Sequence, residues 1–425
     1  MKTSWRTSLW LPDVRPDEAK LLAPLWVLPL TVIGVIAVWT GDALLTLAVL
    51  LALLVSSSLL LWQHYCLAGV SYRRRLSASR AMFGETIELT TELINLKPLP
   101  LTWLQVDDVV PRGLRIDGGT IRPGRTDLTH CLTMIVAMLP YQRLLRRMQV
   151  RCTRRGELVF GPASLESGDY LGTLAKREKQ VGLDHLIVYP KILRVRLGRL
   201  PSNRILGRDA ARRNFLTDPV RTIGTREYTR GDPYRSIDWR ASARRDTLMV
   251  RVSEPSTTPI LDIVLNFLTA TSGGDSWEHD GMEFAISVAA SLAAYGAERG
   301  WAIGVRGNGY SGGMPIDIRP SAAPGQFRTV LETLARATIA ARGSLPSMLA
   351  THDPHVPAGA TLLLITTMLD AYLRASLSDL QRRGRAVLVL QIARDHDASP
   401  VERFPILRIP YDEYWTEHEA LVLGQ

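Results

Sequence analysis

The sequence is poor in the residues that build covalent or metal-dependent frameworks. It has three cysteines in 425 residues, Cys66, Cys131 and Cys152, with no C-x-x-C spacing. This excludes a disulfide framework and a cysteine zinc site, and it fits a reducing compartment. The chain also has no G-x-S-x-G and no phosphate-binding P-loop, so the motifs of common hydrolases and nucleotide-binding enzymes are missing. We therefore expect no catalytic residue, no bound metal and no cofactor.

Acidic residues are outnumbered by basic ones. The 51 Lys and Arg against 41 Asp and Glu give a formal net charge of +10. Such a chain is attracted to membrane headgroups, nucleic acid or acidic proteins. The arginine-rich residues 200–218 lack the interleaved aromatic side chains that stack on bases, so we expect no nucleic-acid partner. The length predicts two or three compact units.

Charge is absent from two long apolar runs near the N-terminus, residues 21–40 and 43–62. Each run has about the 20 residues that a helix needs to cross a lipid bilayer. Only Gly41 and Asp42 separate them. The pattern predicts a two-helix transmembrane hairpin over residues 21–62, and a buried hairpin in a soluble protein is the alternative.

Basic residues flank this hairpin on both sides, while the connection between its helices has none. They are Lys2, Arg6, Arg15 and Lys20 before it, and Arg73, Arg74, Arg75 and Arg80 after it. Positively charged flanks remain on the cytoplasmic side. We therefore predict a multi-pass membrane protein with residues 1–20 and all residues after 69 in the cytoplasm.

Two further regions differ in their hydrophobic period. Residues 70–199 alternate apolar and polar positions between Pro and Gly turns, which predicts a β-sandwich. Residues 256–425 alternate strand-like and helix-like runs, which predicts an α/β domain with a mostly parallel sheet covered on both faces. Its strands are expected at 260–267, 301–305, 361–366 and 386–392, and its helices at 282–299, 327–339 and 371–383. Together these regions predict an α+β multidomain chain.

Residues 200–255 form an arginine-rich linker that contains the run REYTRGDPYRSIDWRASAR from residue 226 onward. Its Gly-Asp-Pro step predicts a turn. The arginines can pair with Asp232 and Asp238, or with a carboxylate or phosphate of a partner. Two interpretations stay open: an internal Arg/Asp lattice that clamps the loop, and a surface that binds a partner.

This run resembles the signature of the bacterial domain-of-unknown-function 58 family, R-x-Y-x-x-G-D-x-x-R-x-I-D-W-x-x-S-A-R. The resemblance implies a bacterial inner-membrane protein with a von Willebrand factor A-like domain at residues 256–425. It also implies a MoxR-type AAA+ ATPase as partner, because members of the family are commonly associated with such ATPases. The matching residues are Arg226, Tyr228, Gly231, Asp232, Arg235, Ile237, Asp238, Trp239, Ser242, Ala243 and Arg244.

The von Willebrand factor A fold is best known for a Mg²⁺ site with the pattern D-x-S-x-S after its first strand. The corresponding positions here are Asn266, Leu268 and Ala270, and a later strand ends in Thr366. Leucine and alanine cannot ligate a hard cation, and asparagine offers only a neutral oxygen. The resemblance therefore implies a degenerate metal site. Asp262 lies on the same strand face as Asn266, and it is either a displaced functional acid or the partner of an arginine in the signature segment.

A glycine-rich run at residues 307–312 spells G-x-G-x-x-G. A dinucleotide site requires a helix to start there, whereas the following residues indicate a turn and a short strand. Asn308 and Gly309 instead predict a hairpin turn.

The sequence favours a non-enzymatic inner-membrane protein. Its cytoplasmic part would be a protein-binding platform that works with a MoxR-type AAA+ ATPase in the assembly or maintenance of envelope complexes. The alternative is a membrane-bound enzyme of envelope metabolism that uses a divalent metal at the altered site.

Overall fold

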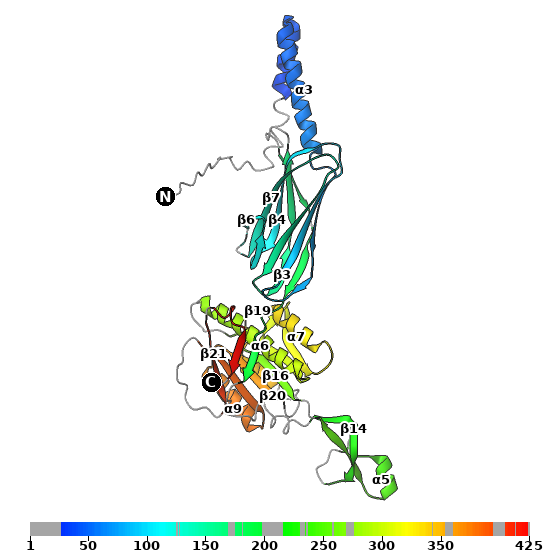
Figure 1. The fold of residues 1–425 in the computed structure, drawn as a ribbon, viewed down its shortest axis with the longest axis vertical. Helices are drawn as coiled ribbons and strands as arrows, with labels where there is room; N and C mark the ends of the chain where they lie inside the picture. The colour runs from blue at the N-terminus through cyan, green and yellow to red at the C-terminus, as the bar shows by residue number, and fades with distance from the viewer. Residues whose placement is uncertain are drawn as a thin grey trace. The chain divides into compact units, whose positions relative to one another are not determined.

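The chain has a mixed α and β fold with several separate sheets (Figure 1). It divides into two compact units. The first comprises Met1–Thr153 and Glu157–Leu186, and the second comprises Arg154–Gly156 and Ile187–Gln425. The computed structural model describes residues 27–124, 126, 128–168, 175–180, 182–197, 216–229, 234, 237–256, 259–268, 276–341, 343–352, 360–393, 404–412 and 414–423.

Some of the predictions fall outside these described residues. They concern residues 1–20, residues 200–215 of the arginine-rich linker, and the positions Gly231, Asp232, Arg235 and Ala270. These predictions stay as stated from the sequence.

Two apolar helices, α2 (Val27–Thr40) and α3 (Ala43–Tyr65), open the described chain. The Asp42 side chain begins α3 by accepting hydrogen bonds from the amides of Leu44 and Leu45, at 3.0 and 3.2 Å. Ala43–Trp62 is long and apolar enough to cross a membrane, and Pro29–Thr40 is a shorter apolar helix. Among the described residues, α3 alone meets that criterion.

Two lysines of the first unit bind the end of α3. The ammonium group of Lys97 donates to the carbonyls of Tyr65, at 2.9 Å, and Cys66. Lys176 donates to the carbonyl of His64 at 3.3 Å. Because the last carbonyls of a helix have no partner within it and carry partial negative charge, these cations stabilise its end. Helix α3 is thereby attached to the strands that follow it.

The first unit contains two larger sheets and a smaller one. The four-stranded sheet has the order β1 (Val70–Leu76), β3 (Thr86–Asn95), β8 (Arg143–Cys152), β5 (Leu114–Asp117). The five-stranded sheet has the order β11 (Ala175–Gln180), β10 (Ala163–Gly168), β4 (Leu101–Pro111), β7 (Thr129–Met138), β6 (Thr120–Pro123). The third consists of β2 (Arg80–Ala81), β12 (Asp184–Val188) and β9 (Gly156–Phe160).

Alternate residues of these strands build the core of the first unit. Leu89 of β3, Val106 of β4 and Val150 of β8 are fully buried. A hydrogen bond of 2.7 Å from the Tyr72 hydroxyl to Asp108 joins β1 to β4, and so links the two larger sheets. The period-two pattern of the sequence therefore predicted these strands correctly.

The second unit is built on one sheet with the order β18-β17-β16-β20-β21-β22. Strands β16 (Ile260–Leu265), β17 (Ala302–Ser311), β20 (Thr361–Thr366), β21 (Ala386–Ala393) and β22 (Ile406–Pro410) pair in parallel. Strands β18 (Met314–Ser321) and β19 (Ala337–Thr338) pair with β17 in the antiparallel sense. Apart from this sheet, β13 (Arg194–Leu197) pairs with β23 (Ala420–Leu423).

Helices pack on both faces of the parallel sheet, as the sequence predicted. Ile263 and Leu265 of β16 belong to the core that includes α6 (Ser276–Glu298) and α7 (Gln326–Ala335). Val264 between them belongs to the core that includes α8 (Leu345–His352) and α9 (Ala371–Arg382). Every second residue therefore faces the same pair of helices.

The hairpin turn predicted at Asn308 and Gly309 was wrong. Both residues lie within β17, and the turn to β18 is made by Gly312 and Gly313, whose φ angles are 55° and 83°. The glycines of β17 serve packing instead. A Cβ atom on Gly309 would lie 2.7 Å from the ring of Phe267, so only glycine lets that ring lie against the strand.

Candidate functional site

The signature segment folds as a strand, a helix and a second strand, which we call the signature ribbon. Strand β14 (Leu216–Glu227) pairs antiparallel with β15 (Met249–Ser256), and the short helix α5 (Trp239–Arg245) lies between them in the chain. Ile237 makes an isolated bridge to Val250. The sequence suggested a loop for the signature segment, but its second half forms helix α5.

Two polar signature residues fix this helix. The Asp238 carboxylate accepts hydrogen bonds from the amides of Arg240, at 3.1 Å, and Ala241, at 3.2 Å, which makes it the helix N-cap. The Ser242 hydroxyl donates to the carbonyl of Asp238 and accepts from the amide of Met249, both at 2.8 Å. Ile237 and Met249 are buried beside them. Asp238 and Ser242 therefore have a local structural role. The sequence signal for it is an N-cap pattern, in which an Asp precedes a run of helix-forming residues.

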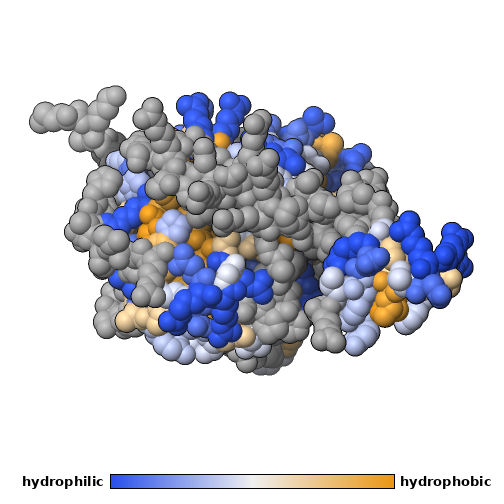
Figure 2. All heavy atoms as spheres, turned by 90° about the horizontal axis from the view of Figure 1, so that it is seen from below, coloured by the Kyte–Doolittle hydropathy of each residue, from blue (hydrophilic) through white to orange (hydrophobic). Residues whose placement is uncertain are grey.

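Several other described residues of the ribbon are exposed to solvent. Trp239 is 68% exposed and Tyr234 is 78% exposed, and Tyr234 stacks on Tyr228 with ring centroids 6.1 Å apart. The arginines of α5, Arg240, Arg244 and Arg245, are exposed as well. Figure 2 shows an apolar patch among hydrophilic side chains on the part that carries the ribbon, at the right of the view. Trp, Tyr and Arg are the residues that most often dominate protein–protein binding energy.

The described residues of the signature divide into a structural set and an exposed set. Asp238 and Ser242 hold the ribbon together, while Trp239 and Arg244 face outward. Arg226 donates to the carbonyl of Glu227 and the hydroxyl of Thr229, at 3.1 and 3.2 Å. The wider Arg/Asp lattice involves Asp232 and Arg235, outside the described residues, and stays a prediction.

The degenerate metal positions meet at the carboxyl edge of the parallel sheet, where β16, β17 and β20 end. The Asn266 amide donates to the Thr366 hydroxyl at 3.1 Å, and its oxygen accepts from Asn308 at 3.1 Å and from the amide of Leu268 at 3.2 Å. The oxygen of Asn308 accepts from the amide of Phe267 at 2.7 Å. The sequence pattern did not place Asn308 in this cluster, because Asn308 and Gly309 predicted a hairpin turn where β17 continues.

This cluster does not fit a divalent cation. Asn266, Asn308 and Thr366 are at most 5% exposed, and their oxygens accept hydrogen bonds from one another and from backbone amides. They are also neutral, whereas such cations favour carboxylates. Within the described ranges, no three His, Cys, Asp or Glu residues are grouped as metal ligands. The cluster closes the edge of the sheet by mutual hydrogen bonding.

Asp262 pairs with an arginine, but not with one from the signature segment. Its carboxylate accepts from both Nε, at 3.1 Å, and Nη2 of Arg306, on the neighbouring strand β17. The two side chains are 0% and 5% exposed. The partner was missed because β17 was expected to end before Arg306. A buried bidentate pair of this kind is a structural element of the sheet.

A family model and a curated relative each match part of this chain. The family described as "Protein of unknown function DUF58" matches residues 224–399. The uncharacterized protein YeaD of Bacillus subtilis (strain 168) is 25% identical over 236 residues, which are 54% of this chain and 53% of YeaD. The match thus spans about half the length of that relative.

Similarity to solved structures is slight. A CARDB domain from Pyrococcus furiosus has 12% identity and a TM-score of 0.19, covering 28% of this chain and 91% of that domain. A cohesin module from Clostridium perfringens has 8% identity and a TM-score of 0.21, covering 28% of this chain and 96% of the module. At these scores, neither supports an argument about fold or function.

Proposed function

Residues 224–399 belong to the DUF58 family, whose function is unknown, and from that premise we propose that the chain is a non-enzymatic, membrane-anchored platform that binds another protein. Its partner is a MoxR-type AAA+ ATPase, and the two act in the assembly or maintenance of envelope complexes. The observation that carries the proposal is the exposed Trp239 on an arginine-rich helix of the family segment.

The anchor is a hairpin of α2 and α3 in the bacterial inner membrane, with both ends of the chain in the cytoplasm. The length and apolar composition of α3 support this, as do the basic residues on either side of the helices. The first unit is a β-sandwich, supported by its two facing sheets. The second is a von Willebrand factor A-like domain, supported by the parallel sheet between two pairs of helices.

The binding surface is the exposed side of the signature ribbon. A tryptophan and a tyrosine supply large rigid apolar area, and three arginines supply charge. Such a surface fits an acidic partner with an apolar pocket for Trp239. The neutral, mutually bonded cluster at the carboxyl edge offers a partner no comparable group.

Co-purification from detergent tests the proposal. A tagged full-length chain is expected to recover a MoxR-type ATPase from native membranes, with recovery compared in the presence and absence of ATP and measured by quantitative mass spectrometry. The combined change Trp239→Ala and Arg244→Ala should reduce recovery about tenfold or more, because such anchors each contribute about 2 kcal/mol or more.

The matched control replaces an exposed aromatic and an exposed arginine elsewhere in the same unit. Tyr372 is 63% exposed on α9, and Arg382 ends the same helix. The change Tyr372→Ala with Arg382→Ala should leave recovery unchanged. The proposal would be refuted if the unmodified chain recovered no such ATPase. It would also be refuted if both double variants lost recovery of the ATPase equally.

A further inference from the structure

Two loops of the first unit lie at the end of helix α3, and we call them the end loops. The first comprises residues 96–100, between β3 and β4, and the second comprises residues 139–142, between β7 and β8. The ammonium group of Lys97, in the first loop, donates to the carbonyl of Tyr65, the last residue of α3, at 2.9 Å. The amide of Tyr141, in the second loop, donates to the carbonyl of Lys97 at 3.3 Å. Both loops are therefore attached to the end of the helix.

The end loops expose apolar side chains. Leu96 is 65% exposed, Leu139 is 67% exposed and Tyr141 is 68% exposed. The two loops contain one charged residue, Lys97. Its side chain is buried, with the ammonium group turned to the carbonyls at the end of α3. The side chains that the end loops expose therefore carry no charge.

Tyr141 has a backbone conformation that is unfavourable for its residue type. Its φ of 54° lies in the left-handed region, where a Cβ atom is crowded. Two hydrogen bonds between Leu139 and Gln142 close the turn: the Leu139 amide donates to the Gln142 side chain at 2.7 Å, and the Gln142 amide donates to the Leu139 carbonyl at 3.3 Å. The turn thus presents an exposed tyrosine where glycine would be less strained. Backbone outliers of this kind cluster at functional positions.

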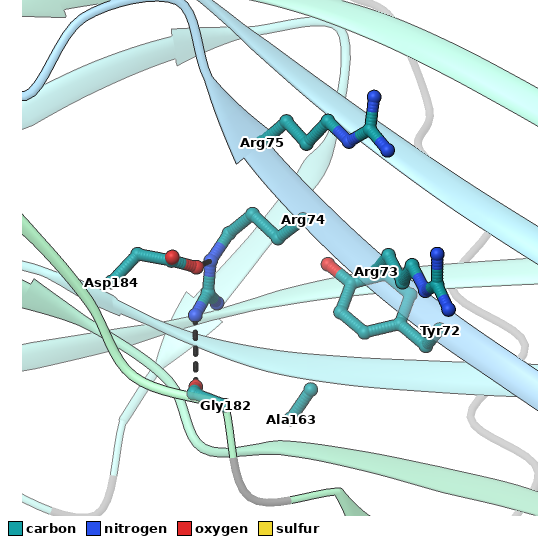
Figure 3. A pocket seen from close by; sticks show the side chains of 7 residues that line it. All are labelled: Tyr72, Arg73, Arg74, Arg75, Ala163, Gly182 and Asp184. Carbon is teal, nitrogen blue, oxygen red and sulfur yellow. Dashed lines mark hydrogen bonds and ion pairs between the residues drawn. The ribbon is translucent and has the colours of Figure 1, made fainter.

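The strands that follow α3 and the first end loop are fixed to each other. Strand β1 begins at Val70, shortly after α3, and β4 begins directly after the first end loop. The Arg74 guanidinium of β1 pairs with Asp108 of β4 and with Asp184, the latter at 2.8 Å. Figure 3 shows Arg74 pointing toward Asp184 and toward the carbonyl of Gly182, which accepts at 3.0 Å. These contacts keep the first end loop in place relative to the start of β1, and so to the end of α3.

The end of α3 lies close to the end of its apolar span. The span is Ala43–Trp62, and Tyr65, which is itself exposed, follows Trp62 by three residues. At about 1.5 Å per residue, Tyr65 lies about 4.5 Å beyond the span along the helix axis. The headgroup layer on each side of a bilayer is about 5–8 Å thick. With α3 in the membrane, the end loops therefore lie at the level of the headgroups, where tyrosine is enriched.

We propose that the end loops insert into the headgroup region of the bilayer, so that the first unit binds the lipid surface beside its own anchor. This inference rests on the membrane anchor of the proposed function and adds a second lipid contact to it. Leu96 and Leu139 bury apolar area at the boundary with the acyl chains, and the amphipathic ring of Tyr141 lies between the apolar and polar layers. Lipid is favoured over a protein partner because the loops adjoin the end of the apolar span.

Fluorescence of the full-length chain in liposomes tests this inference. An environment-sensitive dye is attached to Leu139→Cys or, as the matched control, to Leu128→Cys. Leu128 is 69% exposed and precedes β7, whereas Leu139 follows it, so about 30 Å of strand separates them. Both variants carry Cys131→Ala, since Cys66 and Cys152 are buried and will not be labelled.

The liposomes contain phosphatidylethanolamine, phosphatidylglycerol and a phosphatidylcholine with a nitroxide on its headgroup, which quenches a dye at that depth. The dye at Leu139 should emit at a shorter wavelength than the dye at Leu128. It should also lose most of its emission to the nitroxide and be shielded from aqueous iodide present on both sides of the membrane. The dye at Leu128 should be quenched by iodide and not by the nitroxide.

Two added charges should withdraw the loops from the lipid. Leu96→Asp with Tyr141→Asp should restore most of the emission of the dye at Leu139, because carboxylates stay hydrated. The control pair is Ile121→Asp with Leu128→Asp. Ile121 is 39% exposed on β6, and this pair should leave the quenching at Leu139 unchanged.

Two outcomes would overturn this inference while the chain resists extraction from the liposomes by alkaline buffer. In the first, iodide quenches the dye at Leu139 as strongly as the dye at Leu128. In the second, the dye at Leu139 is shielded from iodide but is not quenched by the nitroxide, which means that protein covers the loops. Extraction of the chain by alkaline buffer would instead overturn the proposed anchor, and this inference with it.

Discussion

The signature ribbon and the carboxyl edge of the parallel sheet place their polar residues in opposite ways. At the edge, Asn266, Asn308 and Thr366 are buried and bonded to one another. On the ribbon, Trp239 and the arginines of α5 are exposed. The edge is where open α/β sheets usually bind ligands, yet among the described residues it is the ribbon that presents the larger set of outward-facing groups. Because its polar groups are buried and bonded to one another, the edge is a weaker candidate for a contact surface than the ribbon.

The largest expected effect comes from breaking the buried ion pair below the edge. Asp262→Ala leaves the Arg306 guanidinium buried without its carboxylate, and should lower the free energy of unfolding by about 3–5 kcal/mol. Hydrogen exchange of peptides that cover β16 and β17 measures this. The double change Asp262→Leu and Arg306→Met should recover most of the loss. A single variant as stable as the unmodified chain would show that the pair is not buried as described.

A smaller loss of stability is expected when the edge cluster itself is changed. Asn266→Ala removes the partner of Asn308, Thr366 and the Leu268 amide, and should cost about 2–3 kcal/mol because buried polar groups lose their bonds. Gln391→Ala is the control on β21, the strand next to β20, since its side-chain oxygen has no hydrogen-bond partner among the described residues. Urea unfolding should separate the two variants. An equal, small effect would mean that the cluster contributes nothing to closing the edge.

On the ribbon, loss of the helix cap should have a local effect of about 1 kcal/mol. Asp238→Ala removes the acceptor for the amides of Arg240 and Ala241, so exchange of the amides of α5 should accelerate. Asp238→Asn retains an acceptor and should restore protection. If asparagine fails to restore it, Asp238 acts through its charge, and the lattice interpretation gains support.

The smallest change in stability is expected at Trp239, whose side chain contacts mainly solvent. Trp239→Ala should alter the free energy of unfolding by less than about 0.5 kcal/mol. Two residues earlier, Ile237 is 5% exposed, and Ile237→Ala should cost about 2–4 kcal/mol. Thermal unfolding in detergent compares the two. A large loss at Trp239 would assign it to the core of the ribbon rather than to a binding surface.

The regular elements of the second unit were predictable because their sequence period is unambiguous. The buried runs over Ile260–Leu265 and Thr361–Thr366 appear as strands β16 and β20, and the expected helix at residues 371–383 appears as α9. The spacing of apolar residues along such a run indicates whether it is a strand or a helix and which of its faces is buried. Short edge strands such as β22, which carry little of this signal, were not predicted.

The details of both candidate sites depended on contacts between distant residues. Nothing local indicates that Gly309 is needed for the ring of Phe267, or that Arg306 is the partner of Asp262. On the ribbon, the many arginines suggested a charged lattice and concealed the N-cap at Asp238. Such pairings follow from strand order and register, which the sequence of one chain does not specify.

The most direct test compares the two regions in one binding assay. The affinity of the purified MoxR-type ATPase is measured for the unmodified chain, for Trp239→Ala with Arg244→Ala, and for Leu268→Asp at the carboxyl edge. We predict that the ribbon variant binds about tenfold more weakly or worse, while the edge variant binds as the unmodified chain does. Loss of binding in Leu268→Asp with full binding by the ribbon variant would contradict the account.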